Sequence, residues 1–188
     1  MKRYGWGFVR RVRRLGLALL IAATTPAAAH VAAHAGDVPF GDRVSPAVSY
    51  YHRATPHIST GGVLGPNGAA ELGALGYRTV IDLRTPKEGT AAERAAVEQL
   101  GLRYVNIPIA KGAPTKAQVA EFTALLSDAG NRPIHVHCAS GNRVGAMWAL
   151  YLAAGGMPPG YALEAGRTAG LRGKREARVR QMLGLPPG

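Results

Sequence analysis

Apolar and polar positions follow two different periods along this chain of 188 residues. Short runs of apolar and β-branched residues, typical of buried strands, alternate with segments whose apolar positions recur every three or four residues, as in amphipathic helices. The predicted strands cover residues 49–57, 79–83, 104–108 and 133–137. The predicted helices cover residues 66–75, 90–100, 115–126, 145–154, 161–169 and 174–183.

Local start and stop signals support these elements. Thr90 with Glu93, and Thr115 with Gln118, have the spacing of a capping box, so each pair predicts the first turn of a helix. A Gly-Gly pair after residue 60 predicts a turn at the end of the first strand.

The order of the elements predicts the fold class. Strands that alternate with helices indicate an α/β domain with a central, mostly parallel sheet flanked by helices. In such sheets ligands bind beyond the carboxyl ends of the strands. Loops that follow a strand are therefore where we expect the chemistry.

The first 35 residues have the pattern of a secretory signal peptide. Six basic residues and no acidic ones precede an apolar run at 15–23 and a segment of small residues at 27–35. We expect cleavage after Ala35 or Ala29, and a periplasmic or secreted protein that contacts the membrane only transiently. The apolar run is short for a membrane span of about 20 residues, so an uncleaved anchor is the lesser alternative. Residues 36–48 then form a linker, and residues 49–188 form the domain.

The charge of the chain changes once this leader is set aside. The whole sequence has 23 basic and 11 acidic residues, and 17 of the basic residues lie beyond the leader. This modest excess, without a basic-aromatic motif, argues against binding of nucleic acid. Five basic residues crowd the last predicted helix, either as a solvated face or as an attraction for an anionic substrate or membrane: Arg172, Lys174, Arg175, Arg178 and Arg180.

The only cysteine of the chain lies in a loop between a predicted strand and a predicted helix. A helix N-terminus gathers free N–H groups and positive potential, which favours a thiolate at Cys138 and binding of an anion. Arg143 adds a planar cation suited to an oxyanion such as phosphate. The alternative is a buried structural cysteine with a salt-bridging arginine.

The segment 137–145 resembles the signature loop of cysteine-dependent protein tyrosine and dual-specificity phosphatases. Residues 51–62 and 75–84 are similar to the N-terminal half of compact bacterial members, especially to the phosphatase-like domain found with beta-lactamase-hydrolase-like proteins. The resemblance covers residues 50–171. It implies a dual-specificity-phosphatase-like fold and hydrolysis of phosphomonoesters, on a protein or a small molecule. We expect no cofactor, and no metal site either, because His135 and His137 share a face of their strand but no third ligand is near them in the sequence.

The resemblance also implies roles for residues of the loop. Cys138 would attack phosphorus and form a phosphocysteine intermediate, and Arg143 would hold the phosphoryl oxygens. His137 would help to hold the thiolate, or would simply pack at the end of its strand. The phosphate cradle would consist of the backbone N–H groups of Ala139, Ser140, Gly141, Asn142 and Arg143.

The loop departs from the common phosphatase pattern in three respects. Four residues rather than five separate Cys138 from Arg143, and Val144 replaces the usual Ser or Thr. Residues 107–115, where such enzymes carry an acidic residue, contain no carboxylate. Asp82 and Glu88 are the nearest candidates for the general acid, although the position of Asp82 within a strand favours a structural role. Without an acid, only substrates with good leaving groups would react quickly.

Two other functions fit the same loop. A spacing of four residues is also similar to the persulfide loop of rhodanese-type sulfurtransferases, in which Cys138 would carry sulfur. A non-catalytic module that binds anions or phosphoproteins would explain the missing acid. An assay with an aryl phosphate, beside an assay of sulfur transfer from thiosulfate to cyanide, separates the three.

Overall fold

The computed structural model of the protein describes residues 44–188. The signal peptide predicted at 1–35 and most of the predicted linker lie outside the described residues. Five strands of the described part form one sheet in the order β1-β2-β5-β3-β4. β1 pairs antiparallel with β2, and the other three neighbouring pairs are parallel. The strands are β1 (His52–Thr55), β2 (Ile58–Gly61), β3 (Thr79–Asp82), β4 (Arg103–Asn106) and β5 (Ile134–His137).

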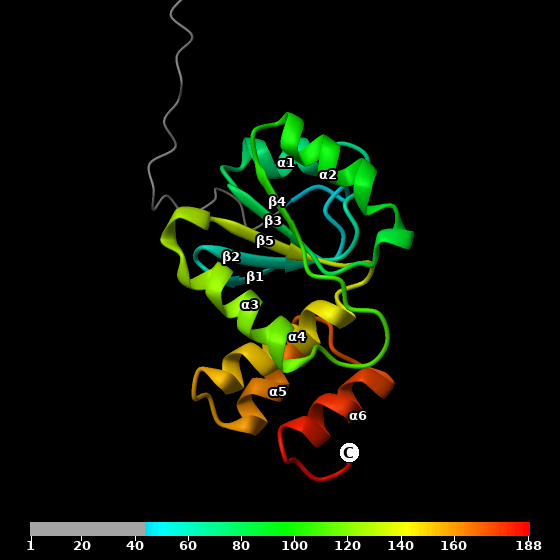
Figure 1. The fold of residues 1–188 in the computed structure, drawn as a ribbon, viewed down its shortest axis with the longest axis vertical. Coiled ribbons are helices and arrows are strands. Elements are labelled where there is room, and N and C mark those ends of the chain that lie inside the picture. Colours follow the sequence, from blue (N-terminus) through cyan, green and yellow to red (C-terminus); the bar gives the residue numbers. More distant parts are fainter. Residues whose placement is uncertain (1–43) are drawn as a thin grey trace, which may run out of the picture. The chain divides into compact units, whose positions relative to one another are not determined.

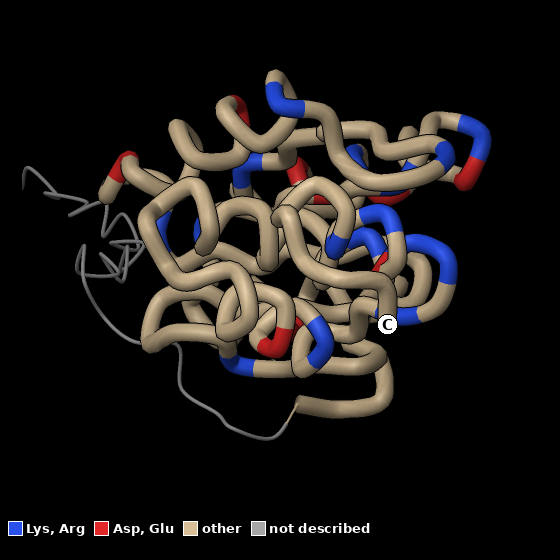
Figure 2. Tube along the Cα trace, turned by 90° about the horizontal axis from the view of Figure 1, so that it is seen from below, with Lys and Arg blue, Asp and Glu red and all other residues tan. Residues whose placement is uncertain are grey.

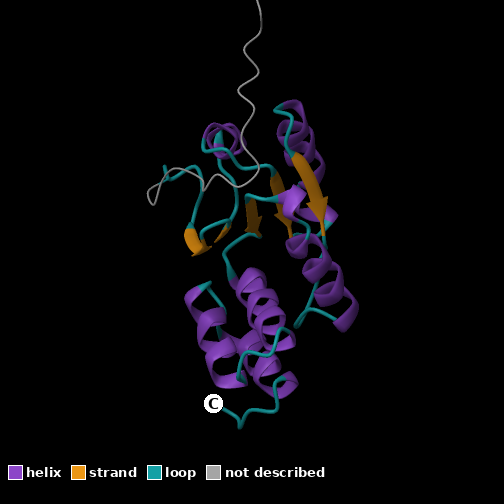
Figure 3. Cartoon of the chain, turned by 90° about the vertical axis from the view of Figure 1, so that its left-hand side faces the viewer, coloured by secondary structure: helices purple, strands orange, loops and turns teal. Residues whose placement is uncertain are grey.

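Helices pack on both faces of this sheet, which confirms the predicted α/β class with a mostly parallel sheet (Figure 1). Figure 3 shows the strands lying between the two groups of helices. Among the described residues, no helix is long and apolar enough to cross a membrane. One face carries α1 (Gly68–Ala74) and α2 (Thr90–Gln99), and the other carries α3 (Lys116–Ser127) and α4 (Asn142–Ala154). The last two helices, α5 (Pro159–Thr168) and α6 (Gly173–Met182), pack against α4.

The alternation of residues along β5 assigns different chemistry to the two faces. Ile134 and Val136 are fully buried in the core that includes α3 and α4. His135 and His137 point to the other face because successive side chains of a strand alternate. The face under α1 and α2 therefore holds buried polar groups beside its apolar core.

The first predicted strand is present but shorter than expected, since β1 covers residues 52–55 of the predicted 49–57 and lies at the edge of the sheet. The sequence alone did not predict β2. β1 turns back at residues 56–57 into β2, and β2 lies next to β5 inside the sheet. Gly61 belongs to β2 and not to a turn. A Cβ at Gly61 would lie 3.0 Å from Cε1 of His135, so this glycine permits close packing across the sheet.

One of the two predicted capping boxes is confirmed. The hydroxyl of Thr115 accepts a hydrogen bond from the backbone N–H of Gln118 at 3.2 Å, and the backbone N–H of Thr115 donates to Oε1 of Gln118 at 2.9 Å. The box predicted at Thr90 is wrong, because Gly89 precedes α2 and Glu93 turns into the interior. Ion pairs with buried partners outweigh a cap at this position.

A short 3-10 helix, η1 (Pro86–Glu88), was not expected from the sequence. It has the capping box that α2 lacks, formed by Thr85 and Glu88. A second 3-10 turn, η2 (Ala129–Asn131), precedes β5. η1 follows directly after β3, at the end of the sheet where Cys138 leaves β5.

Helices α5 and α6 pack closely against α4. A Cβ on Gly145 of α4 would lie 2.4 Å from the carbonyl oxygen of Gly166 in α5, so only glycine allows this approach. Val179 of α6 is fully buried in the same core. Helices α5 and α6 are therefore held against α4, next to the loop that begins at Cys138.

Candidate active site

The loop that contains Cys138 begins where β5 ends and leads into α4. Cys138 is 1% exposed, and Gly141 takes a φ of 79° as the residue before the helix. That left-handed conformation favours glycine, and a Cβ there would also lie 3.1 Å from the carbonyl oxygen of Ala169. The loop is fixed from the β2 side as well, since the N–H of Val63 donates to the carbonyl of Ala139 at 3.2 Å.

Arg143 lies in the first turn of α4 and forms a bidentate pair with Glu88 of η1. Its Nη1 and Nη2 donate to Oε2 and Oε1 of Glu88 at 2.7 and 2.6 Å, and Nη1 also donates to the carbonyl of Ile109 at 3.3 Å. Hydrogen bonds from Arg143 are the main cause that lowers the pKa of Glu88 to about 2, and the same pair raises the pKa of Arg143. Glu88 is thus a carboxylate at neutral pH, and it orients the guanidinium.

Cys138 and Arg143 line one cavity of about 820 Å³ beyond the carboxyl ends of β3 and β5. Two other predicted cradle residues, Ser140 and Asn142, line it too, whereas Ala139 and Gly141 lie in the loop but not in this lining. The loop after β4 contributes no acid to it. The lining consists of Thr85, Pro86, Lys87, Glu88, Ala110, Lys111, Cys138, Ser140, Asn142, Arg143 and Arg175.

His137 precedes Cys138 but its ring lies on the other face of the sheet. Its Nε2 is 2.8 Å from Oε1 of Glu93 and 3.9 Å from Oδ1 of Asp82. Its ring stacks on that of His135 with 5.8 Å between the centroids. The role of His137 toward the thiolate therefore stays a prediction, and its observed contact is with the carboxylate of α2.

Asp82 is fully buried and does not belong to the cavity lining. Arg84 donates to both of its carboxylate oxygens at 2.8 to 3.0 Å, and the hydroxyl of Tyr104 donates at 2.7 Å. Burial alone would raise the pKa of Asp82, but the bonds from Arg84, together with His137 and Tyr104, hold it below its ordinary value. This geometry favours the structural role for Asp82 over that of a general acid.

Asp82, Glu93 and His137 bring three ligand atoms within 4.8 Å of one another, a spacing that a metal ion could use. Arg84, however, donates to Asp82 and also lies 2.7 Å from Oε2 of Glu93. Its guanidinium already supplies the positive charge that the two carboxylates require. A cation beside it would be repelled, so these residues do not fit a metal site.

The sequence alone did not predict the contact of Glu88 with Arg143 or the place of Arg175 in the cavity lining. The link between Glu88 and Arg143 spans 55 positions and leaves no local pattern. The spacing of Thr85 and Glu88 is a readable capping box that would have placed Glu88 at a helix start. Arg175 was counted only as one charge of a basic helix.

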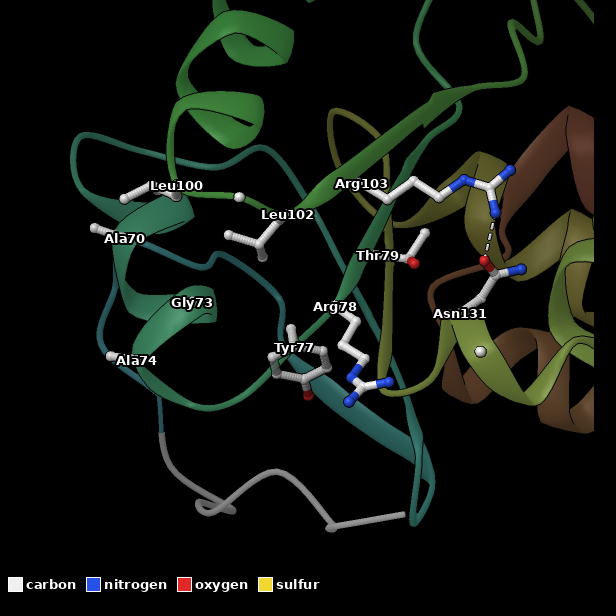
Figure 4. Close-up of a pocket in the computed structure, with 12 residues that line it drawn as sticks. Ala70, Gly73, Ala74, Tyr77, Arg78, Thr79, Leu100, Leu102, Arg103 and Asn131 are labelled. Atoms are coloured by element: carbon white, nitrogen blue, oxygen red, sulfur yellow. Dashed lines mark hydrogen bonds between the residues drawn. The ribbon is translucent and has the colours of Figure 1, made fainter. Parts of the chain in front are cut away.

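A second cavity, of about 470 Å³, lies at the opposite ends of the strands (Figure 4). Thr79 and Arg103, the first residues of β3 and β4, line it, and Arg103 donates a hydrogen bond to Asn131 there. Ligands of parallel sheets bind beyond the carboxyl ends of the strands, not at this amino end. The cavity with Cys138 lies at the end of the sheet where ligands of parallel sheets bind.

Comparison with known proteins finds a family match and structures with a similar fold. Residues 47–177 match the protein family described as "PTP-NADK: DSP-PTPase phosphatase fused to NAD+ Kinase". That range contains the Cys138 loop. A curated relative, "Probable NAD kinase 2, chloroplastic" from Oryza sativa subsp. japonica, is 32% identical over 101 residues. The match covers 49% of this chain and only 10% of the relative's length.

Solved structures share the fold. A candidate phosphatase of Shewanella putrefaciens CN-32 has a TM-score of 0.62 at 21% identity, over 76% of this chain and 94% of that one. A cysteine-to-serine variant of TpbA from P. aeruginosa, solved in complex with pTyr, has a TM-score of 0.54 at 22% identity, over 76% of this chain and 94% of that one. At these identities the likeness supports the architecture.

Proposed function

This chain belongs to the family of DSP-PTPase phosphatases fused to NAD+ kinase, and from this membership we propose that Cys138 hydrolyses phosphomonoesters through a phosphocysteine intermediate. The protein is a protein tyrosine phosphatase-like phosphoric monoester hydrolase. The observation that carries the mechanism is the shared cavity, in which Cys138 and Arg143 face the same space at a helix N-terminus. Three properties of that cavity explain how the reaction proceeds.

The first property is the depth of the nucleophile. Cys138 is almost fully buried at a cavity wall, so a small phosphoryl group reaches its sulfur more easily than a bulky centre does. Attack forms a bond from sulfur to phosphorus and breaks the bond from phosphorus to the leaving oxygen. Water then cleaves the sulfur–phosphorus bond, which releases phosphate and restores the thiolate.

The second property is the orientation of Arg143. Its bidentate pair with Glu88 fixes the plane of the guanidinium before substrate binds. Free N–H groups at the start of α4 add donors for the phosphoryl oxygens. Charge that develops on these oxygens during transfer is thereby stabilised without reorganisation of the site.

The third property is the absence of an acid from residues 107–115. Of the cavity-lining residues only Glu88 carries a carboxyl group, and its pKa of about 2 leaves it without a proton at neutral pH. The leaving oxygen must therefore depart as an anion or take a proton from water. Aryl phosphates, whose leaving groups are stable anions, are the substrates that this site favours, and the pTyr bound by the TpbA variant belongs to that class.

Sulfur transfer is less well supported than phosphoryl transfer. The spacing of four residues between Cys138 and Arg143 suggested it, but the family match spans that loop. A short loop is therefore compatible with membership of a phosphatase family.

Trapping of the intermediate tests the proposed function. Protein lacking residues 1–35 is mixed with 4-nitrophenyl phosphate and quenched in acid within one turnover. We expect the peptide that contains Cys138 to gain the mass of one phosphoryl group. Turnover without this adduct would contradict the phosphocysteine step. Transfer of sulfur from thiosulfate to cyanide, with no release of nitrophenol, would overturn the phosphatase assignment.

A Glu88→Gln variant is expected to lower kcat/KM by about tenfold, because Arg143 loses its charged partner and part of its orientation. Glu88 is a positioning residue and not the acid in this proposal. The ratio of rates for 4-nitrophenyl and phenyl phosphate should therefore stay unchanged. A larger loss with phenyl phosphate, whose leaving group needs protonation more, would instead identify Glu88 as the general acid.

We propose, from the leader pattern at residues 1–35, that the enzyme acts outside the cytoplasm. The intact mass of protein from a bacterial expression host, measured separately in periplasmic and cytosolic fractions, tests this. We expect cleaved protein, beginning at residue 36 or 30, in the periplasmic fraction. Uncleaved protein confined to the cytosol would contradict export.

A further inference from the structure

The cavity that contains Cys138 has positive side chains in addition to Arg143, which in the proposed function holds the transferred phosphoryl group. Its lining includes four basic side chains and one carboxylate, and that carboxylate is already paired with Arg143. In Figure 2, basic segments gather around the label of the C-terminus, which follows α6. The other three basic side chains of the lining are Lys87, Lys111 and Arg175.

Arg175, on α6, is the least compensated of these cations. Its Nε and one of its terminal nitrogens, Nη1, are buried and have no hydrogen-bond partner within residues 44–188. Burial is the main cause that lowers the pKa of Arg175, and repulsion from Arg143 lowers it further. Buried donors without acceptors cost free energy in the unliganded protein, so a ligand that accepts from them is bound more tightly.

The nearby carboxylates are committed elsewhere. Glu176 follows Arg175 in sequence but accepts from Nε of Arg167 in α5 at 3.0 Å. Glu88 faces the same cavity but accepts from both terminal nitrogens of Arg143. Neither of these two carboxylates therefore forms a hydrogen bond with Arg175, although the charge of Glu88 still favours its charged form.

The start of α6 is fixed to the catalytic loop. The N–H of Arg172 donates to Oδ1 of Asn142 at 3.1 Å, and Nδ2 of Asn142 donates back to the carbonyl of Arg172 at 3.3 Å. The Arg172 side chain also donates to the hydroxyl of Ser140 at 3.2 Å. The helix that carries Arg175 is consequently anchored to the loop that contains Cys138.

We propose that Arg175 binds a second anionic group of the substrate, so that this phosphatase site prefers small phosphomonoesters with a second phosphate or carboxylate near the scissile one. The inference rests on the proposed function and deepens it. A cavity of about 820 Å³ is of a size that holds a small ligand of this kind. Lys87 and Lys111 line the same space and add to its positive potential.

Two aryl phosphates with similar leaving groups test the second site. Phenyl phosphate lacks a second anion, and 3-carboxyphenyl phosphate has one. We expect Arg175→Gln to raise KM for 3-carboxyphenyl phosphate by about tenfold, and KM for phenyl phosphate by less than about twofold, with kcat unchanged for both. Arg178→Gln removes the same charge from an exposed position of α6 outside the cavity, and should leave both KM values unchanged.

Three results would overturn the proposal. An equal rise of KM for both substrates, or a fall in kcat for both, would place Arg175 on the transferred phosphoryl group. If the enzyme prefers a second anion only in acidic phosphotyrosine peptides, the basic side chains of the cavity lining bind a protein substrate and not a small one. If Arg178→Gln raises KM for 3-carboxyphenyl phosphate as much as Arg175→Gln does, the effect comes from the overall positive charge of α6 and not from a binding site at Arg175.

Binding to a Cys138→Ser variant separates this inference from the proposed function, because calorimetry needs no turnover. If 3-carboxyphenyl phosphate binds about tenfold more tightly than phenyl phosphate, and Arg175→Gln removes the difference, the second site is supported even when no hydrolysis is found. Equal binding of the two compounds by an active enzyme would overturn the second site and leave the phosphatase function standing.

Discussion

Replacement of Cys138 by serine is expected to lower kcat for 4-nitrophenyl phosphate by about a thousandfold or more. The hydroxyl of serine is not ionised at neutral pH, and Glu88, the one carboxylate of the cavity lining, is paired with Arg143 and has a pKa of about 2, which makes it a weak base. Arg143 and the N-terminus of α4 remain, so the variant should still bind phosphate. The measurements are steady-state rates and calorimetric titration with inorganic phosphate.

Thermal unfolding of the Cys138→Ser variant is the control for its fold. Cys138 is buried, and serine differs from it by one atom, so the midpoint of thermal unfolding should change by only a few degrees. Residual activity above about a tenth of the wild-type value would exclude Cys138 as the nucleophile. If both proteins bind phosphate and neither hydrolyses a phosphomonoester, the protein is a binding module.

Replacement of Arg84 by leucine is expected to reduce the free energy of unfolding by about 3 to 5 kcal/mol at neutral pH. The change removes the guanidinium that pairs with Asp82 and Glu93, and leaves two carboxylates in a buried site with one histidine. Denaturation in urea, followed by circular dichroism, measures the difference. Arg94→Leu breaks an exposed pair with Glu98 and should cost less than about 1 kcal/mol.

The loss should depend on pH in a defined direction. In the wild type the pKa of Asp82 is lowered, so its contribution to stability is present above its ordinary pKa and is lost as pH falls. Without Arg84, burial raises the pKa instead, and stability is lost as pH rises. The penalty of Arg84→Leu should therefore be smaller at about pH 4.5 than at about pH 7. Asp82→Asn in the same background should recover part of it, and an equal penalty at both pH values would contradict the buried charge.

Short-range signals predicted much of the fold. The strands at β3, β4 and β5 and the helices that follow them lie within a few residues of their predicted positions, since the hydrophobic period reports burial directly. Strand β2 was missed because the Gly-Gly pair at 61–62, where it ends, was read as a turn, whereas Gly61 permits close packing inside the sheet. A turn and a close approach between strands require the same residue, and sequence alone does not separate them.

The sequence by itself determined the position and chemistry of the Cys138 loop, because the strand, the thiol, Gly141 and Arg143 lie within ten residues of one another. The tertiary structure decided which distant charges meet: Glu88 with Arg143, Glu93 with Arg84 and His137, and Arg175 with the cavity of Cys138. Electrostatic pairing depends on distance and burial and not on separation along the chain. These partners follow from the packing of η1, α2 and α6 around the carboxyl ends of the strands, which no period or motif in the sequence encodes.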